Sequence, residues 1–273
     1  MSRTSTGAVP ASTGRAPLRL LLPAVAGLVV LLAPLAALVA RTPWATLPER
    51  LADPEILMAL RLSVVTATIA SVLCLVMGLP LAWVLARTAF RARSLLRALV
   101  TVPLVLPPVV AGVALLSAFG RNGVVGGPLR DWFDLTIPYT TTAVVLAQTF
   151  VALPFVVISI EGALRATNRA YDDVAAVLGA DRWGIFARVT VPLALPGIAA
   201  GLVLGWARAL GEFGATITFA GNYPGSTQTM PLAVYTALQS DPEAAVVLSL
   251  ILLVVSVAVL ALLRERWFGQ AAR

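Results

Sequence analysis

Two residues of opposite charge, Arg208 and Glu212, lie well inside an apolar stretch of this 273-residue chain. Because they are four residues apart, they share one face of a helix and can form an ion pair. If this helix crosses a membrane and begins at the inner face near residue 191, a rise of about 1.5 Å per residue places Arg208 about 25 Å along its axis. Arg208 would then lie close to the outer face of the membrane. Two interpretations follow: a surface ion pair that reaches water, or the outer mouth of a solute pathway in which Arg208 offsets the charge of an anion.

Few other side chains in the chain can take part in chemistry. All 20 basic residues are arginine, and the sequence contains neither lysine nor histidine. A P-loop ATPase needs a lysine against the nucleotide phosphates, so this chain cannot itself be one. The usual general base and imidazole metal sites are also excluded, and the single cysteine, Cys74, cannot build a thiolate cluster. We therefore expect a chain that is not an enzyme and that binds no metal or cofactor of its own.

The composition predicts a membrane protein. Hydrophobic residues make up 59% of the chain and charged residues only 12%, with a mean hydropathy of +0.91, whereas soluble domains carry about 25% charged residues. A helix needs about 20 apolar residues to cross the hydrocarbon layer. The charge-free stretch 213–240 is interpreted as a loop, because residues 221–228 are typical of one. We place six membrane-spanning helices near residues 18–40, 58–86, 96–119, 140–160, 191–218 and 244–263.

The arginines are distributed unevenly between the two ends of these helices. Fourteen of the 20 lie in the N-terminal segment up to Arg19, the loops 87–97 and 161–188, and the tail 264–273. Positive charge accumulates on the cytoplasmic side of a membrane, so both termini are expected inside the cell. The net charge of +7 then reflects topology rather than nucleic-acid binding. A cleaved signal peptide is the alternative interpretation of residues 15–40, but its apolar core would have about 21 residues instead of the usual 7–15, which favours an uncleaved first helix.

Three glycines in the fifth span, Gly197, Gly201 and Gly205, recur at four-residue spacing. Such a row lets two helix backbones approach closely in lipid. We interpret it as a packing seam, within one subunit or between two copies, although an Ala- and Gly-rich chain can also produce the row by coincidence.

Prolines and isolated polar residues mark the third and fourth spans. A proline inside a helix frees a carbonyl and bends the axis, and broken helices often line the cavity of a transporter. The same residues can instead form a simple kink or bridge neighbouring helices. The candidate pathway residues are Arg208, Glu212, Phe213, Pro107, Pro108, Gln148 and Thr149.

The segment between the fourth and fifth spans, residues 161–188, is long for a connection between membrane helices. Four apolar residues in it recur at the spacing of one helix face: Tyr171, Val174, Ala175 and Leu178. Asn168 is a suitable N-cap for this helix, and Gly179 a suitable end. Asp172 and Asp173 suit its first turn. A short amphipathic helix of this kind can insert into a groove of a partner protein or lie on the lipid headgroups.

The same segment resembles the conserved loop of ATP-binding-cassette importer permeases. Its pattern is Asp173-Val174-Ala175, three residues, Gly179, nine residues and Val189-Thr190-Val191-Pro192. The family pattern has Glu-Ala-Ala, three residues, Gly, nine residues, Ile, one residue and Leu-Pro, so the spacing is intact and the substitutions conserve charge or volume. The resemblance implies a coupling helix that docks in a cleft of a cytosolic ATPase. The implied coupling residues are Glu161, Tyr171, Asp172, Asp173, Val174, Ala175, Leu178, Gly179, Ala180, Asp181, Arg182 and Pro192.

Three further segments, 102–112, 144–165 and 207–235, resemble molybdate-type permease subunits, and sulfate permeases are close relatives of these. The resemblance implies an all-α, polytopic inner-membrane protein of a prokaryote with six transmembrane helices and the type I importer permease fold. The expected organisation is a disordered cytoplasmic tail (1–17), a first helix with an outer loop (18–56), a permease core (57–263) and a cytoplasmic tail (264–273).

The function that the resemblance implies is ATP-driven import of molybdate by alternating access. The expected partners are a second copy of the chain, cytosolic ATPase subunits that hold ATP and magnesium, an extracytoplasmic molybdate-binding protein and the lipid bilayer. The alternatives are a sulfate or tungstate permease of the same kind, or a secondary transporter driven by an ion gradient. The last is disfavoured because Glu212 alone supplies few carboxylates for ion coupling.

Overall fold

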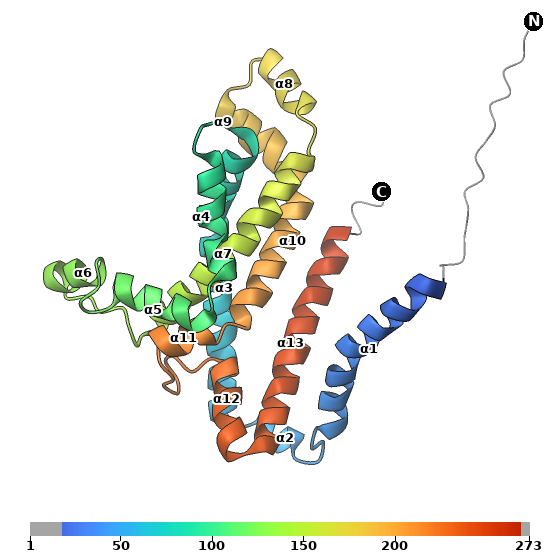
Figure 1. The fold of residues 1–273 in the computed structure, drawn as a ribbon, viewed down its shortest axis with the longest axis vertical. Helices are drawn as coiled ribbons and strands as arrows, with labels where there is room; N and C mark the ends of the chain where they lie inside the picture. Colours follow the sequence, from blue (N-terminus) through green and yellow to red (C-terminus); the bar gives the residue numbers. More distant parts are fainter. Residues whose placement is uncertain (1–17, 269–273) are drawn as a thin grey trace, which may run out of the picture. The chain divides into compact units, whose positions relative to one another are not determined.

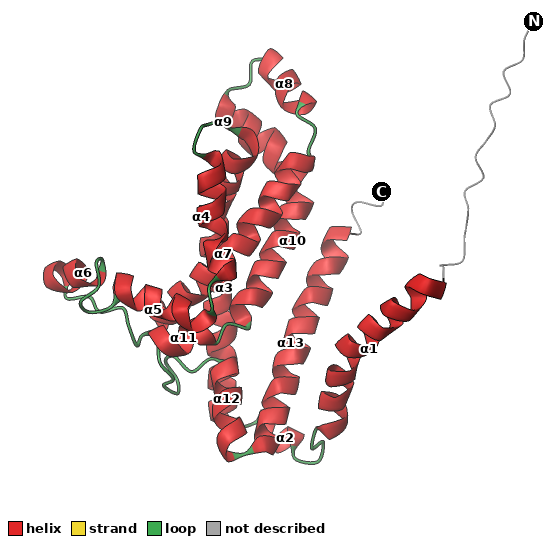
Figure 2. Cartoon of the chain, viewed as in Figure 1, coloured by secondary structure: helices red, strands yellow, loops and turns green. Residues whose placement is uncertain are grey.

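The computed structural model describes residues 18–268, so the expected disordered tail at 1–17 lies outside the described part of the chain. Within that part, all regular structure is helical and no strand is present (Figure 2). The predicted all-α class is therefore confirmed. The chain divides into two compact units, residues 1–42 and 43–273. In the first unit, α1 (Leu18–Arg41) is an apolar helix that contains two prolines, Pro23 and Pro34.

Three long helices of the second unit form its main core: α3 (Pro54–Arg87), α7 (Thr141–Ala166) and α10 (Val191–Leu210). They lie side by side, with α7 packed against both α3 and α10 (Figure 1). Small residues of α3, such as Ala67, Ala70 and Ala82, are fully buried in this core. Because small side chains let the backbones approach closely, van der Waals contact can hold the helices together in lipid.

The last long helix, α13 (Pro242–Phe268), packs against the short helix α12 (Met230–Ser240) and against α10. With α1, α3, α7 and the helix that ends in α10, it completes a set of five helices long and apolar enough to cross a membrane. Three further short helices are α2 (Leu47–Leu51), α6 (Gly126–Phe133) and α8 (Ala170–Val177).

The predicted third span, 96–119, is not one straight helix. It consists of α4 (Arg93–Val105) and α5 (Pro108–Phe119), whose axes differ by 117°. Leu106 and Pro107 between them have extended ψ angles of 130° and 139°. A residue that precedes proline avoids the helical region, and proline donates no hydrogen bond, so the consecutive prolines end the first helix here. The pair counts as a sixth span only if both halves are taken together.

The predicted fifth span, 191–218, is wrong at both ends. The helix begins at α9 (Arg182–Ile185), continues through a π-helical turn (Phe186–Thr190) into α10, and ends at Leu210. A separate helix, α11 (Gly214–Phe219), follows after a break at Gly211. The region 213–240 is therefore not a simple loop, because it contains both α11 and α12.

The row of glycines on α10 faces α7. A Cβ atom built on Gly197 would lie 2.3 Å from Ala163 Cβ, one on Gly201 would lie 2.8 Å from Ser159 Cβ, and one on Gly205 would lie 2.3 Å from Val156 Cγ2. Real Cβ atoms essentially never approach another atom this closely. In this chain the row therefore lies at the contact between two helices of one subunit.

We predict that Gly205→Leu destabilises the protein, because the new side chain would collide with Val156. Overpacking of this kind costs about 1–3 kcal/mol, which should appear as a lower midpoint of thermal unfolding in detergent. Gly162→Leu is the matched control, because a Cβ at Gly162 of α7 has no neighbour within 4 Å. An equal loss of stability in both variants would contradict the tight α7–α10 contact.

Candidate functional site

The helix α8 forms close to where the local sequence predicts it, although its N-cap residue is Arg169 and not the predicted Asn168. The Asn168 side-chain oxygen accepts a hydrogen bond from the backbone N–H of Ala170 at 3.0 Å, and Asp172 and Asp173 lie in the first turn, near the positive end of the helix dipole. The helix ends before Gly179, whose φ of +87° favours glycine. The chain can therefore turn sharply back toward α9.

One side of α8 exposes a cluster of large apolar side chains. Tyr171 and Val174 are each 58% exposed, and Val177 and Leu178 are 88% and 81% exposed. We call these four residues the apolar tip. Val177 was missed by the prediction from spacing, whereas Ala175 is only half-exposed. Exposed apolar side chains gathered on one short helix are typical of a surface that binds another protein.

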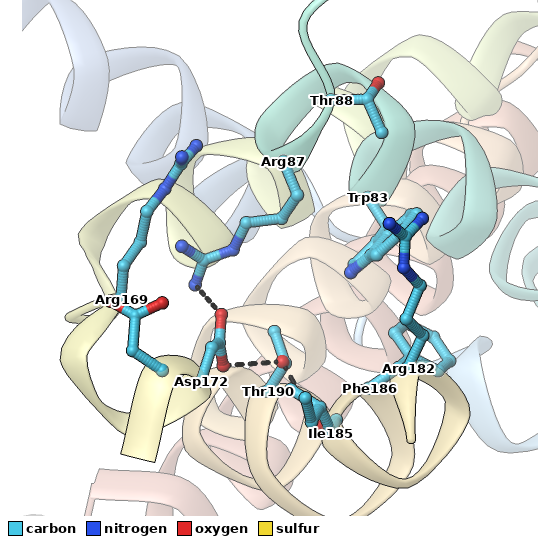
Figure 3. A pocket seen from close by; sticks show the side chains of 10 residues that line it. Trp83, Arg87, Thr88, Arg169, Asp172, Arg182, Ile185, Phe186 and Thr190 are labelled. Atoms are coloured by element: carbon cyan, nitrogen blue, oxygen red, sulfur yellow. Dashed lines mark hydrogen bonds and ion pairs between the residues drawn. The ribbon is translucent and has the colours of Figure 1, made fainter. Parts of the chain in front are cut away.

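The other side of α8 is tied to the ends of two long helices (Figure 3). One oxygen of the Asp172 carboxylate lies 3.6 Å from Arg87 Nη2, at the last residue of α3. The other oxygen accepts a hydrogen bond from Thr190 Oγ1 at 3.0 Å, in the π-helical turn that leads into α10. Arg87 Nη2 also donates to Thr167 Oγ1 at 2.5 Å. We call Asp172, Arg87 and Thr190 the anchor.

Arginines also cap the carboxyl end of α3. Arg169, just before α8, donates to the backbone oxygen of Ala86 at 3.2 Å. Arg93, at the start of α4, donates to the backbone oxygen of Leu85. These carbonyls belong to the last turn of α3, which lacks helical partners and carries partial negative charge. The anchor therefore lies among positive charges that local spacing alone does not reveal.

The remaining residues of the predicted coupling set take several different positions. Glu161 is buried inside α7, where it pairs with Arg97 and, at 2.7 Å, with Arg165. The loop therefore starts at Thr167 and not at residue 161, because α7 continues to Ala166. Asp181 caps α9 by accepting from the N–H of Gly184 at 3.0 Å. Of the other members, Gly179 and Ala180 lie between α8 and α9, Arg182 is the first residue of α9, and Pro192 lies in the first turn of α10.

The second group of candidate residues lies at the break between α10 and α11. Arg208 Nη2 is 2.8 Å from Glu212 Oε2, and the Glu212 side chain is only 1% exposed. The other Glu212 oxygen accepts from the N–H of Ala215 at 2.8 Å, which satisfies the start of α11. The Arg208 guanidinium carbon lies 6.0 Å from the centre of the Phe155 ring. The buried carboxylate is thus paired on both oxygens.

Trp206, two residues before Arg208, contacts α3 and shows how far along α3 this part of α10 lies. Trp206 Nε1 donates to Thr68 Oγ1 at 3.2 Å. Thr68 lies about 21 Å along α3 from Pro54, at about 1.5 Å per residue. Trp206 is therefore set back from the first residue of α3 by about this distance.

The other candidate pathway residues are only partly brought together. Gly214 of α11 packs against Pro108, because a Cβ atom at Gly214 would lie 2.4 Å from Pro108 Cβ. The Phe213 ring lies 5.1 Å from that of Tyr235. Gln148 and Thr149 are buried on α7, and their side-chain polar atoms have no hydrogen-bond partner among the described residues. Of the predicted pathway residues, Pro108 therefore lies next to the break between α10 and α11. Gln148 and Thr149 lie buried on α7 instead.

Comparison with known proteins matches residues 78–272 to the family "Binding-protein-dependent transport system inner membrane component". The chain is 51% identical over 238 residues to the "Molybdenum transport system permease protein ModB" of Mycobacterium tuberculosis, covering 87% of this chain and 90% of that one. It is 38% identical over 228 residues to the "Sulfate transport system permease protein CysT" of Escherichia coli, covering 82% of each.

Among solved structures, the chain resembles "a bacterial ABC transporter involved in the import of the acidic polysaccharide alginate". The TM-score is 0.72, with 17% identity, over 92% of this chain and 94% of that chain. At this identity the likeness concerns the fold alone. It confirms the expected fold of an importer permease with several transmembrane helices.

We predict that Asp172→Asn loosens α8, because the neutral amide loses the ion pair with Arg87 and weakens the bond from Thr190. Hydrogen bonds to charged groups contribute about 1.5–3 kcal/mol, so amide hydrogen exchange in residues 170–178 should become markedly faster. Asp173→Asn is the matched control, because its exposed side chain has no ion-pair or hydrogen-bond partner among the described residues. Unchanged exchange in Asp172→Asn would contradict the anchor.

Proposed function

The chain belongs to the family of binding-protein-dependent transport system inner membrane components, and we propose that it is the permease subunit of an ATP-driven molybdate importer. It is a multi-pass protein of the prokaryotic inner membrane, with several helices apolar enough to cross it. The proposal joins this membership to one structural observation: the apolar tip of α8 is exposed while the opposite side of the same helix is anchored.

An anchored helix with an exposed apolar tip suits a mechanical contact with a motor protein. We propose that a cytosolic ATPase binds Tyr171, Val174, Val177 and Leu178 in a cleft of its own, as amphipathic helices bind in grooves. That partner would hold ATP and magnesium, since this chain lacks the lysine that a P-loop needs. The permease itself would then be non-catalytic and would bind no cofactor.

The anchor gives a route by which movement of α8 reaches the membrane helices. Asp172 contacts the end of α3 through Arg87 and the start of the α10 helix through Thr190. When the ATPases close on ATP, displacement of α8 would pull on both helices together. In the proposed alternating-access cycle, two copies of the chain enclose the pathway, ATP binding opens it outward and hydrolysis resets it.

The cargo is inferred from the relatives and from charge. The similarity to the mycobacterial molybdenum permease exceeds that to the sulfate permease, at 51% against 38% identity. The predicted outer loops 41–55 and 120–135 carry five acidic and four basic residues, so they do not favour capture of a free anion. We propose that an extracytoplasmic binding protein delivers molybdate and supplies most of the selectivity, while Arg208 offsets the charge of the anion during passage.

We predict that Leu178→Glu prevents stable association with the ATPase, because a charge would enter an apolar contact. Loss of a central apolar contact costs about 2 kcal/mol or more, so co-purification should fall by about tenfold or more. Val124→Glu is the control. Val124 is 84% exposed, about as much as Leu178 at 81%, but it lies in the predicted outer loop, away from the ATPase. Stoichiometric co-purification of Leu178→Glu with the ATPase would contradict the docking role.

We also predict ATP-dependent molybdate uptake by vesicles that contain the permease, its ATPase and its binding protein, without any ion gradient. Labelled molybdate should accumulate only with ATP, and excess tungstate should compete more strongly than excess sulfate. Uptake that needs a proton or sodium gradient but no ATP would favour a secondary transporter instead. Equal uptake of labelled sulfate would reassign the cargo without changing the class of transporter.

A further inference from the structure

Two cavities meet at the inner end of α3. The first, of about 320 Å³, lies between the end of α3 and the helices α8 and α9. The second, of about 720 Å³, runs along α3 from Leu75 to Val84 and is closed on one side by α9 and the π-helical turn. Trp83, Arg182 and Phe186 line both of them, so the two cavities adjoin each other at these residues. We call them the arginine pocket and the apolar groove.

The arginine pocket has the chemistry of a site for an anionic group (Figure 3). Arg87, Arg169 and Arg182 line it, and so do Asp172 and Asp173, which leaves an excess of positive charge. The Arg87 side chain is only 8% exposed, and its buried Nε has no hydrogen-bond partner among the described residues. A buried, charged donor without an acceptor is costly. An anion in the pocket would satisfy it.

Of the three arginines of the pocket, Arg182 lies where the two cavities adjoin. It has no ion-pair partner within the described part of the chain. Figure 3 shows its side chain alongside Trp83 and Phe186. The Trp83 and Phe186 rings lie 5.9 Å apart in an edge-to-face arrangement, and the Trp183 ring lies 5.4 Å from that of Phe186 at a tilt of 38°. Tryptophan beside arginine is typical of the boundary between membrane and water.

The apolar groove has the length and character of a site for an acyl chain. Val76 in its wall is 65% exposed, and Leu75, Leu79 and Pro80 extend the same apolar surface. From Leu75 to Val84, α3 rises about 13 Å, which approaches the thickness of one membrane leaflet, about 15 Å. The groove therefore begins near mid-membrane and ends at the positively charged pocket.

We propose that an anionic phospholipid of the inner leaflet occupies both cavities, with its phosphate at Arg182 and Arg87 Nε and an acyl chain along the groove. This assignment rests on the proposed function for the cytoplasmic location of α8. Because Asp172 of α8 and Phe186 of the π-helical turn line the cavities, the bound lipid would brace the anchor between α8 and α3.

The charge of the pocket favours a phospholipid over another helix as the occupant of the cavities. The helix α1 is apolar enough to cover the groove, but Leu18–Arg41 contains no acidic residue that could pair with Arg87 or Arg182. A second copy of the chain would likewise have to bring a carboxylate to the buried Nε. A phospholipid supplies both the apolar chain and the negative charge in one molecule.

The test is lipid binding to the purified permease–ATPase complex, measured by native mass spectrometry with added phosphatidylglycerol or phosphatidylcholine. We expect phosphatidylglycerol to bind preferentially, and Arg182→Gln to weaken it about fivefold, as for loss of one arginine near a lipid surface. Arg188→Gln is the matched control, because Arg188 is exposed in the π-helical turn but does not line either cavity. Arg182→Gln should fold normally, because its side chain is exposed.

A second pair of variants tests the groove. Val76→Trp should fill it and reduce binding, whereas Met77→Trp, at a 45% exposed neighbour outside the groove, should not. Equal binding by all variants, or equal binding of phosphatidylcholine, would overturn the proposal. So would binding of inorganic phosphate but not of lipid, or photo-crosslinking from position 76 to α1 or to a second copy. Lipid binding is measured without transport, so a failure of molybdate uptake would contradict the proposed function but not the lipid site.

Discussion

The pairing of buried carboxylates with arginine is the interaction on which the rest of this structure depends. Within the described residues, the two buried carboxylates are Glu161 and Glu212, and each is paired with an arginine. Asp172, at the cytoplasmic end, is paired with Arg87 in the same way. An unpaired carboxylate in an apolar interior is strongly unfavourable. Arginine suits this role because its guanidinium group offers five donors, so it can bind a carboxylate and a backbone carbonyl together.

Each of these pairs joins segments at a point where the helices change direction or end. Glu161 links α7 to Arg97 of α4, Asp172 links α8 to the end of α3, and Glu212 holds the break between α10 and α11. The helices between these points are held mainly by close contact of small apolar residues. The polar pairs therefore determine where the helices can move relative to one another, whereas the apolar contacts determine which helices stay together.

The cytoplasmic end combines both kinds of contact. The apolar tip is exposed, and the anchor on the reverse side of the same helix connects it with α3 and α10. The arginine pocket lies next to the anchor, so a lipid bound there would act on the same link. A motor protein and the inner leaflet would thus both act on the α8–α3 junction.

Much of this organisation is predictable from local sequence. Composition predicts the apolar spans around α1, α3, α7 and α13 and the excess of cytoplasmic arginine, and periodicity predicts the two turns of α8. Both signals come from residues that are close together in the sequence. The spacing of Arg208 and Glu212 also predicts that they can pair. By contrast, the 117° angle between α4 and α5 depends on the packing of α5 against α11, where Gly112 and Gly214 allow the backbones to approach. The Arg87 side chain meets the Thr167 hydroxyl, eighty residues away. Glu161 leaves the predicted loop for the core, where it pairs with Arg97 of α4. Only the assembled helices bring these side chains within reach of one another.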